Sequence, residues 1–257
     1  MSPPDLALLA RIHGQLRDGL AAGATIRPVA AFALYLWPRD DTFYRSRALP
    51  VARPATAWRD DIASLSGAFA AASTPARLEF LDELWPDLAA ALAAAGFHCE
   101  QAATVLARST DVPVPPAAAA AVLLQAAAPH DLAAFIVAAE AAHGFAPRPI
   151  PSEETAWLAA DLARGRTMIA AVLADGRPVA GACLIGVGRV AELAAVWSAP
   201  AQRRRGLATA ACSRLLTAFT ARGGELVWLG TSDAMALRLY HRLGFVPVGT
   251  QLNFAGT

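Results

Sequence analysis

The protein is a chain of 257 residues, of which 56% are hydrophobic and 17% are charged. Its 22 basic side chains are all arginines and balance 21 acidic ones to a net charge of +1, which argues against a general nucleic-acid binder. The longest apolar run, residues 117–124, is too short to cross a bilayer, and Asp5 and Arg11 interrupt any signal-peptide core. The three cysteines are widely spaced and form no zinc or disulfide pattern. We therefore expect a cytoplasmic protein with no membrane, nucleic-acid or metal partner.

Hydrophobic spacing predicts both helices and strands in the first half of the chain. The expected helices lie at residues 3–22, 58–71 and 86–95, and the expected strands at 29–36, 77–81 and 98–107, with a turn at 37–41. Three prolines then fall within residues 113–116, where neither a helix nor a central strand can continue. We place the boundary between two domains here, which gives an N-terminal accessory domain at 1–112 and a second domain at 117–257.

The second half of the chain alternates strands and helices, with glycines at the turns. The expected strands are 120–126, 167–173, 178–187, 190–198, 225–230 and a last pair within 245–254, and the expected helices are 130–143, 152–164, 203–222 and 233–243. This order indicates an α/β layer built on a mixed sheet.

A weak internal repeat links the two halves. Phe80 is followed 16 residues later by Gly96-Phe97, and Trp228 is followed 16 residues later by Gly244-Phe245. A strand, a helix and a Gly-Phe pair form a common α/β unit, so convergence is one interpretation. The other is that the N-terminal half is a decayed copy of the C-terminal half.

The strongest local signal is the loop Arg203-Arg204-Arg205-Gly206-Leu207-Ala208, which joins a strand to a long helix. A helix N-terminus offers unpaired N–H groups and a partial positive charge, and a glycine lets a ligand approach the backbone closely. Such a loop suits a pyrophosphate, with the arginines adding charge at its rim. The alternative is a solvated basic turn before an amphipathic helix.

The C-terminal half resembles the GCN5-related N-acetyltransferase (GNAT) family over about residues 119–257. The loop at 203–208 fits the family's Q/R-x-x-G-x-G/A motif, and residues 236–245, ALRLYHRLGF, fit its last-helix pattern A-x-x-L-Y-x-x-x-G-F. The resemblance implies an α/β fold whose central sheet is mixed, mostly antiparallel and flanked by helices. It also implies acetyl-CoA as cosubstrate. Asp233 departs from the family pattern, which often has Asn there, and Leu92 stands at the repeat position of Tyr240.

The resemblance also assigns roles to residues of the preceding strand and the last helix. Tyr240 is the expected acid that protonates the leaving thiolate, with packing beside Phe245 as its alternative. The strand itself suggests Glu192 as the candidate base, because this residue is a polar break at the start of an otherwise apolar strand; a strand-end surface role is its alternative. By strand alternation, Glu192 and Ser198 should share one face. The expected cofactor-binding residues are Val196, Trp197, Ser198, Arg203, Arg204, Arg205, Gly206, Leu207 and Ala208.

The resulting hypothesis is an acetyl-CoA-dependent N-acetyltransferase. Its acceptor is a primary amine, expected on a small molecule because an N-terminal domain would wall the cleft. Two alternatives remain open at this point: a non-catalytic acyl-CoA-binding regulator, and an enzyme that acetylates proteins. The chain is expected to act as a monomer or homodimer.

Overall fold

Helices of the N-terminal half form where apolar side chains recur at helical spacing. The computed structural model describes residues 3–37, 46–117, 119–125, 127–186 and 188–256. In the N-terminal half, the helices are α1 (Leu6–Ala21), α2 (Trp58–Ala71) and α3 (Leu88–Ala94), with a short 3-10 turn η1 (Asp82–Leu84), and all three predicted helices are confirmed. The strands are β1 (Thr25–Val29), β2 (Phe32–Leu36), β3 (Arg47–Pro50), β4 (Arg77–Leu81) and β5 (His98–Ser109).

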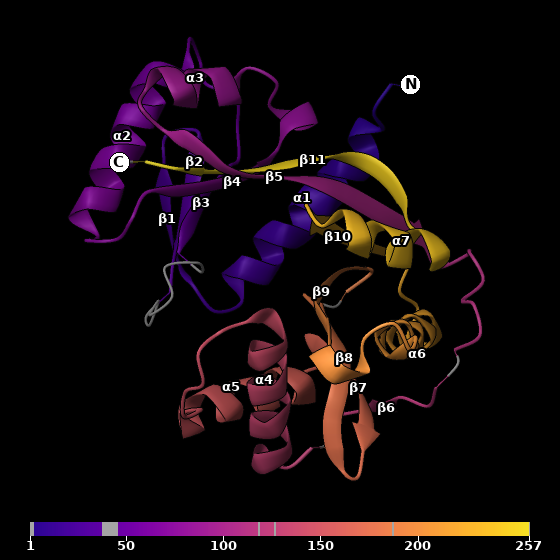
Figure 1. Ribbon diagram of the computed structural model, residues 1–257. Helices are drawn as coiled ribbons and strands as arrows, with labels where there is room; N and C mark the ends of the chain where they lie inside the picture. The colour runs from indigo at the N-terminus through magenta and orange to yellow at the C-terminus, as the bar shows by residue number, and fades with distance from the viewer. Residues whose placement is uncertain (1–2, 38–45, 118, 126, 187, 257) are drawn as a thin grey trace. The chain divides into compact units, whose positions relative to one another are not determined.

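The C-terminal half follows the predicted order with shifted ends (Figure 1). Its helices are α4 (Pro129–His143), α5 (Ser152–Ala163), α6 (Leu207–Ala221) and α7 (Ala234–Arg242), with a 3-10 turn η2 (Pro200–Gln202). Its strands are β6 (Val122–Leu123), β7 (Thr167–Ala174), β8 (Arg177–Ile185), β9 (Val190–Ser198), β10 (Leu226–Thr231) and β11 (Val246–Ala255).

Several expected elements were wrong in detail. The single strand predicted at 29–36 is a hairpin, because Ala30 adopts a φ of +49° and turns the chain between β1 and β2. The strand β3 was not predicted, and residues 38–41 of the expected turn lie outside the described residues. A pair of strands was predicted within 245–254, but the structure has a single strand there, β11.

The chain divides into two compact units. Unit 1 comprises the described residues of Met1–Leu106, Gly230–Ala234 and Pro247–Thr257, and unit 2 those of Ala107–Leu229 and Met235–Val246. This division falls near the proline-rich segment, but unit 1 also takes the last strand. In unit 1, β11 pairs with β4 over five residues, so the end of the chain completes the sheet of the N-terminal half.

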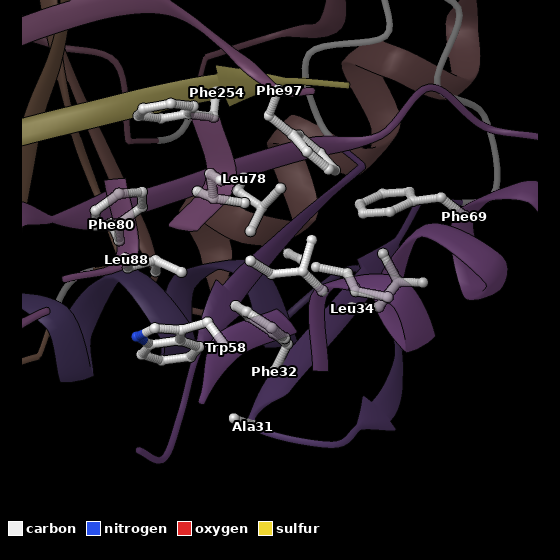
Figure 2. Packing of buried hydrophobic residues seen from close by; sticks show 14 residues of the cluster. Ala31, Phe32, Leu34, Trp58, Phe69, Leu78, Phe80, Leu88, Phe97 and Phe254 are labelled. Atoms are coloured by element: carbon white, nitrogen blue, oxygen red, sulfur yellow. The ribbon is translucent and has the colours of Figure 1, made fainter. Parts of the chain in front are cut away.

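Strands of unit 1 run in the order β1-β2-β3-β4-β11-β5. The β1–β2, β2–β3 and β4–β11 pairs are antiparallel, and β3–β4 is parallel. One face of this sheet packs against α2 and α3 through an aromatic core, shown in Figure 2, which includes Phe32, Trp58, Phe69, Phe80 and Phe254. Burying each such side chain contributes about 1.5–3 kcal/mol to stability.

Strands of unit 2 run in the order β10-β9-β8-β7-β6. The β6–β7, β7–β8 and β8–β9 pairs are antiparallel, and β9–β10 is parallel. Helices α4 and α5 cover one face of the sheet through Leu132, Phe135 and Leu162, and α6 covers the other through Ala210 (Figure 1). Within the described residues, no helix combines the length and apolar character that a membrane span needs.

Candidate active site

The parallel strands β9 and β10 pair only at their beginnings. Within the described residues, their register runs from Val190 opposite Leu226 to Glu192 opposite Trp228. Strand β9 then continues to Ser198 without β10 beside it. The edge of β9 beyond Glu192 therefore offers backbone groups to an extended ligand, in the manner of an added strand.

A β-bulge interrupts the pairing of β9 with β8 in the same stretch of the strand. Ala195 has a φ of +47°, and the register with β8 shifts between Gly181 and Cys183. The extra residue reverses the side-chain alternation beyond it. Glu192 therefore lies on one face of the strand and Ser198 on the other, so the expectation that they share a face was wrong.

Trp197 contributes its side chain to the core of unit 2. It is 4% exposed, and its ring meets that of Phe135 edge-on at 5.6 Å. A Cβ atom at Gly181 would lie 2.4 Å from the Phe135 ring, so only glycine permits this contact. Trp228 is fully buried as well. Only the backbone of Trp197 can therefore contribute to ligand binding, and the neighbouring Val196 and Ser198 are half-buried.

The loop between β9 and α6 is built around two left-handed residues. Arg204 has a φ of +63°, and Gly206, the N-cap of α6, has a φ of +76°. Helix α6 begins at Leu207 rather than at the predicted residue 203, so the three arginines belong to the loop. This conformation is typical of anion-binding turns, and the first amides of a helix lack intrahelical acceptors.

The charge around this helix start is positive. Arg203, Arg204 and Arg205 are exposed, and the first turn of α6 contains no acidic residue. Two of the arginines also hold the loop in place: Arg203 donates to the carbonyl of Ala142 at 3.1 Å, and Arg205 donates to Gln202. Leu207 and Ala208 are half-buried, so their contribution to an anion site is limited to the backbone.

Tyr240 lies near the end of α7 and is 8% exposed. Its ring meets that of Phe245 at 6.0 Å with an interplanar angle of 69°. Phe245 donates its N–H to the carbonyl of Tyr240 at 3.0 Å, and Gly244 donates to that of His241, also at 3.0 Å. With Gly244 at a φ of +86°, these bonds form a Schellman motif that fixes the helix end carrying Tyr240.

Arg108 supports the same helix end, and the sequence analysis missed it. Its side chain is 1% exposed, and its Nε donates to the carbonyl of Leu243 at 2.7 Å. The guanidinium also donates to the carbonyls of Ser109 and Val112. Burial lowers the pKa of Arg108. A positive group at a helix C-terminus is favoured by the helix dipole. A lone arginine directly after the apolar residues 105–107 was the available signal.

Two of the three thiols in the chain are unsuited to nucleophilic chemistry. Burial raises the pKa of Cys183 and that of Cys212 to about 12, so both thiols stay protonated at neutral pH. Cys99 is exposed and belongs to unit 1. Among the described residues, no group of His, Cys, Asp and Glu side chains is arranged to hold a metal ion.

Part of the chain is similar to a known protein family. The family model described as "Acetyltransferase (GNAT) family" matches residues 134–245, which include β9, the loop at 203–208 and α7 up to Phe245. No curated protein matches the chain. A solved GCN5-related N-acetyltransferase from Kribbella flavida is 26% identical, with a TM-score of 0.78 over 96% of this chain and 95% of that one.

Two further solved structures support the fold alone. A GCN5-related N-acetyltransferase from Sphaerobacter thermophilus is 16% identical, with a TM-score of 0.66 over 88% of this chain and 76% of that one. A tandem GNAT protein from the clavulanic acid biosynthesis pathway is 16% identical, with a TM-score of 0.61 over 90% and 79%.

Residues 134–245 therefore match the GNAT family model, and the chain is similar in sequence and fold to a GCN5-related N-acetyltransferase. The structural likeness to the Kribbella flavida protein covers both halves of the chain, so the N-terminal half also has a GNAT-like fold. The predicted fold class is confirmed.

Proposed function

We propose that the protein transfers the acetyl group of acetyl-CoA to the primary amine of a small molecule by direct attack. The observation that carries this proposal is the early separation of β9 from β10, followed directly in the chain by the left-handed loop and the start of α6. The strand edge suits the pantetheine arm, and the helix start suits the pyrophosphate.

The residues at the helix start fit an anionic cosubstrate. Gly206 and Arg204 hold the loop in a left-handed turn, three arginines surround it, and the first helical turn carries no carboxylate. Binding would rely mainly on the amides from Gly206 to Ala208. The exposed arginines would add less, because each exposed charge contact is worth about 1 kcal/mol or less.

The proposed chemical roles follow from the positions of the residues on β9 and α7. Acetyl-CoA supplies a thioester carbonyl that is activated toward an amine. A backbone N–H of Val196, Trp197 or Ser198 would polarise that carbonyl. Tyr240 would protonate the leaving thiolate. Glu192, at the last position of β9 that pairs with β10, would take the proton of the amine through a water.

Direct attack is favoured over a covalent acyl-enzyme. A cysteine route needs a thiolate, and the buried thiols of Cys183 and Cys212, with pKa values of about 12, provide none at neutral pH. In the proposed mechanism, the amine therefore attacks the thioester in a ternary complex.

Thiol release from acetyl-CoA, measured against a panel of small amines, tests this function. The expected result is turnover with at least one amine that depends on both Gly206 and Tyr240. Tight acetyl-CoA binding with no turnover on any small amine or peptide would contradict the proposal and would indicate a regulator. Turnover only on peptides would replace the small-molecule acceptor with a protein.

A further inference from the structure

Unit 1 contains a cavity of about 640 Å³, which is within the usual range of small-molecule sites. Residues from β3, β4, β11 and β5 line it, together with Gly230 and Ser232, and all of them belong to unit 1. Its charged side chains are Arg47, Arg77, Glu79 and Glu100, and Gln101, Gln251 and Asn253 add side-chain amides.

The strand alternation separates this lining from the aromatic core. On β4, Leu78 and Phe80 point to the core shown in Figure 2, so Arg77 and Glu79 point to the opposite face. On β11, Asn253 lies directly opposite Glu79 and therefore shares its face. The cavity thus has a charged floor on the sheet face that α2 and α3 do not cover.

A buried hydrogen-bonded network forms this floor. Glu79 is 4% exposed and Gln251 is 8% exposed. One carboxylate oxygen of Glu79 accepts from the guanidinium of Arg47, and the other accepts from the side-chain amide of Gln251. Both oxygens are thereby fixed in orientation, as the groups of a binding site must be.

A second ion pair lies at the edge of the cavity. Arg77 and Glu100 approach to 3.1 Å, and their side chains are 24% and 32% exposed. Beside them, the amide of Gln101 donates to the hydroxyl of Ser232 at 3.2 Å. The cavity therefore presents two guanidinium groups and two carboxylates at two levels of exposure.

Stability alone does not account for this arrangement. A buried ion pair is seldom more stabilising than well-packed apolar side chains of similar volume. Apolar residues on this face could also have filled the space. In ligand-binding cavities, polar groups held in fixed positions orient the ligand and provide specificity.

We propose that this cavity binds a small zwitterion, that is, a molecule carrying both an ammonium and a carboxylate group. The guanidinium groups of Arg47 and Arg77 attract the carboxylate, and the carboxylates of Glu79 and Glu100 attract the ammonium. A ligand with a single charge would pair either with the two guanidinium groups or with the two carboxylates. Its apolar end would then face the remaining charged groups of the cavity. The proposal concerns binding and does not depend on the acetyl-transfer function.

Calorimetric titration of the whole chain with matched probes tests the proposal. The zwitterions are the straight-chain amino acids from glycine to 6-aminohexanoate, and the single-charge probes are hexanoate and hexylamine. We expect at least one zwitterion to bind about tenfold more tightly than either single-charge probe. No saturable binding of any zwitterion, or equal binding of a single-charge probe, overturns the proposal.

Variants at the edge of the cavity locate the binding. Arg77→Gln and Glu100→Gln each remove one partly exposed charge, so the fold should tolerate both. We expect each to weaken the best zwitterion about tenfold, while Arg148→Gln, in an ion pair of unit 2, changes nothing. Unchanged binding in both edge variants places the zwitterion elsewhere and overturns the proposal.

A final comparison separates this site from the acetyl-CoA site. Gly206→Pro should leave zwitterion binding unchanged, because Gly206 belongs to unit 2. Incubation of the best zwitterion with acetyl-CoA then distinguishes two kinds of ligand. The proposal of a zwitterion site holds for either kind. An N-acetylated product identifies an acceptor, whereas binding without acetylation identifies a ligand that does not react.

Discussion

The two halves of the chain share one plan but differ where chemistry is expected. Each has three antiparallel strands in succession, a helix, a fourth strand parallel to the third, and a second helix that ends in Gly-Phe. Gly96 has a φ of +89°, and Phe97 donates to the carbonyl of Leu92 at 3.0 Å, as Phe245 does to Tyr240. Leu92 and Tyr240 thus occupy the same position of the same helix-ending motif.

The differences concern charge and one hydroxyl group. The first turn of α2 carries Asp60 and Asp61, whereas the first turn of α6 carries no acidic residue. The N-cap of α2 is Ala57 in an extended conformation, whereas that of α6 is a left-handed glycine. Carboxylates at a helix N-terminus already satisfy its positive charge and repel a phosphate. A shared fold therefore does not imply a shared site, and our proposal of acetyl transfer concerns unit 2 alone.

The largest expected effect concerns the difference between the N-termini of α6 and α2. Gly206→Pro should abolish acetyl-CoA binding, because proline fixes φ near −65°, whereas Gly206 has +76°, and it removes one N–H donor. The equivalent change in unit 1, Ala57→Pro, should leave the affinity unchanged. Calorimetry on both variants makes the comparison, and unchanged affinity in Gly206→Pro would place the cosubstrate elsewhere.

The second prediction concerns the hydroxyl that Leu92 lacks. Tyr240→Phe should lower kcat about 10²- to 10⁴-fold with little change in acetyl-CoA affinity, because it removes only the proposed acid. Its ring contact with Phe245 should survive, so the melting temperature should stay near that of the unmodified protein. Tyr35→Phe, at a buried tyrosine of β2, is the matched control and should keep full activity. Full turnover by Tyr240→Phe would assign the proton to another group.

The third prediction concerns the buried arginine that supports the end of α7. Arg108→Met should reduce the free energy of unfolding by about 1–3 kcal/mol, because buried carbonyls lose their donor. It should also lower kcat about tenfold to a hundredfold, because Tyr240 loses its fixed position. Arg108→Lys should restore part of both losses.

Combining the substitutions separates positioning from stability. In a protein that already carries Tyr240→Phe, Arg108→Met should still lower stability but should reduce kcat no further. An undiminished additional loss of kcat would show that Arg108 acts independently of Tyr240.

The smallest expected effect is on stability in unit 1. Burial lowers the pKa of His13, whose Nε2 lies 2.9 Å from the carbonyl of Pro50. Stability from a group with a lowered pKa is present above its unfolded value, about 6.5, and is lost as the pH falls below that value. The melting temperature should therefore fall in acid, and His13→Gln should flatten that dependence. An unchanged pH profile in the variant would show that other groups cause the acid loss.

The sequence predicted what depends on local pattern. The helices α1 and α2 have clear apolar spacing, and the spacing from Phe80 to Gly96 and from Trp228 to Gly244 revealed the repeat. The roles of Glu192, Tyr240 and the loop stay predictions that await the experiments above.

The features that sequence reasoning missed depend on distant contacts or unusual backbone. Ala30 and Ala195 adopt positive φ values that alanine rarely takes, so neither the hairpin nor the bulge had a local signal. Arg108 donates to the carbonyl of Leu243, 135 residues away in the chain, and β11 pairs with β4 of the other half. Such contacts follow from tertiary packing, which periodicity does not encode.

Counting acetyl-CoA sites tests the central claim most directly. Titration of the whole chain by calorimetry should give one site per chain, because the start of α2 carries two carboxylates where α6 carries none. That single site should disappear in Gly206→Pro. Two sites per chain, or one site that survives Gly206→Pro, would contradict the assignment of acetyl-CoA to unit 2 alone.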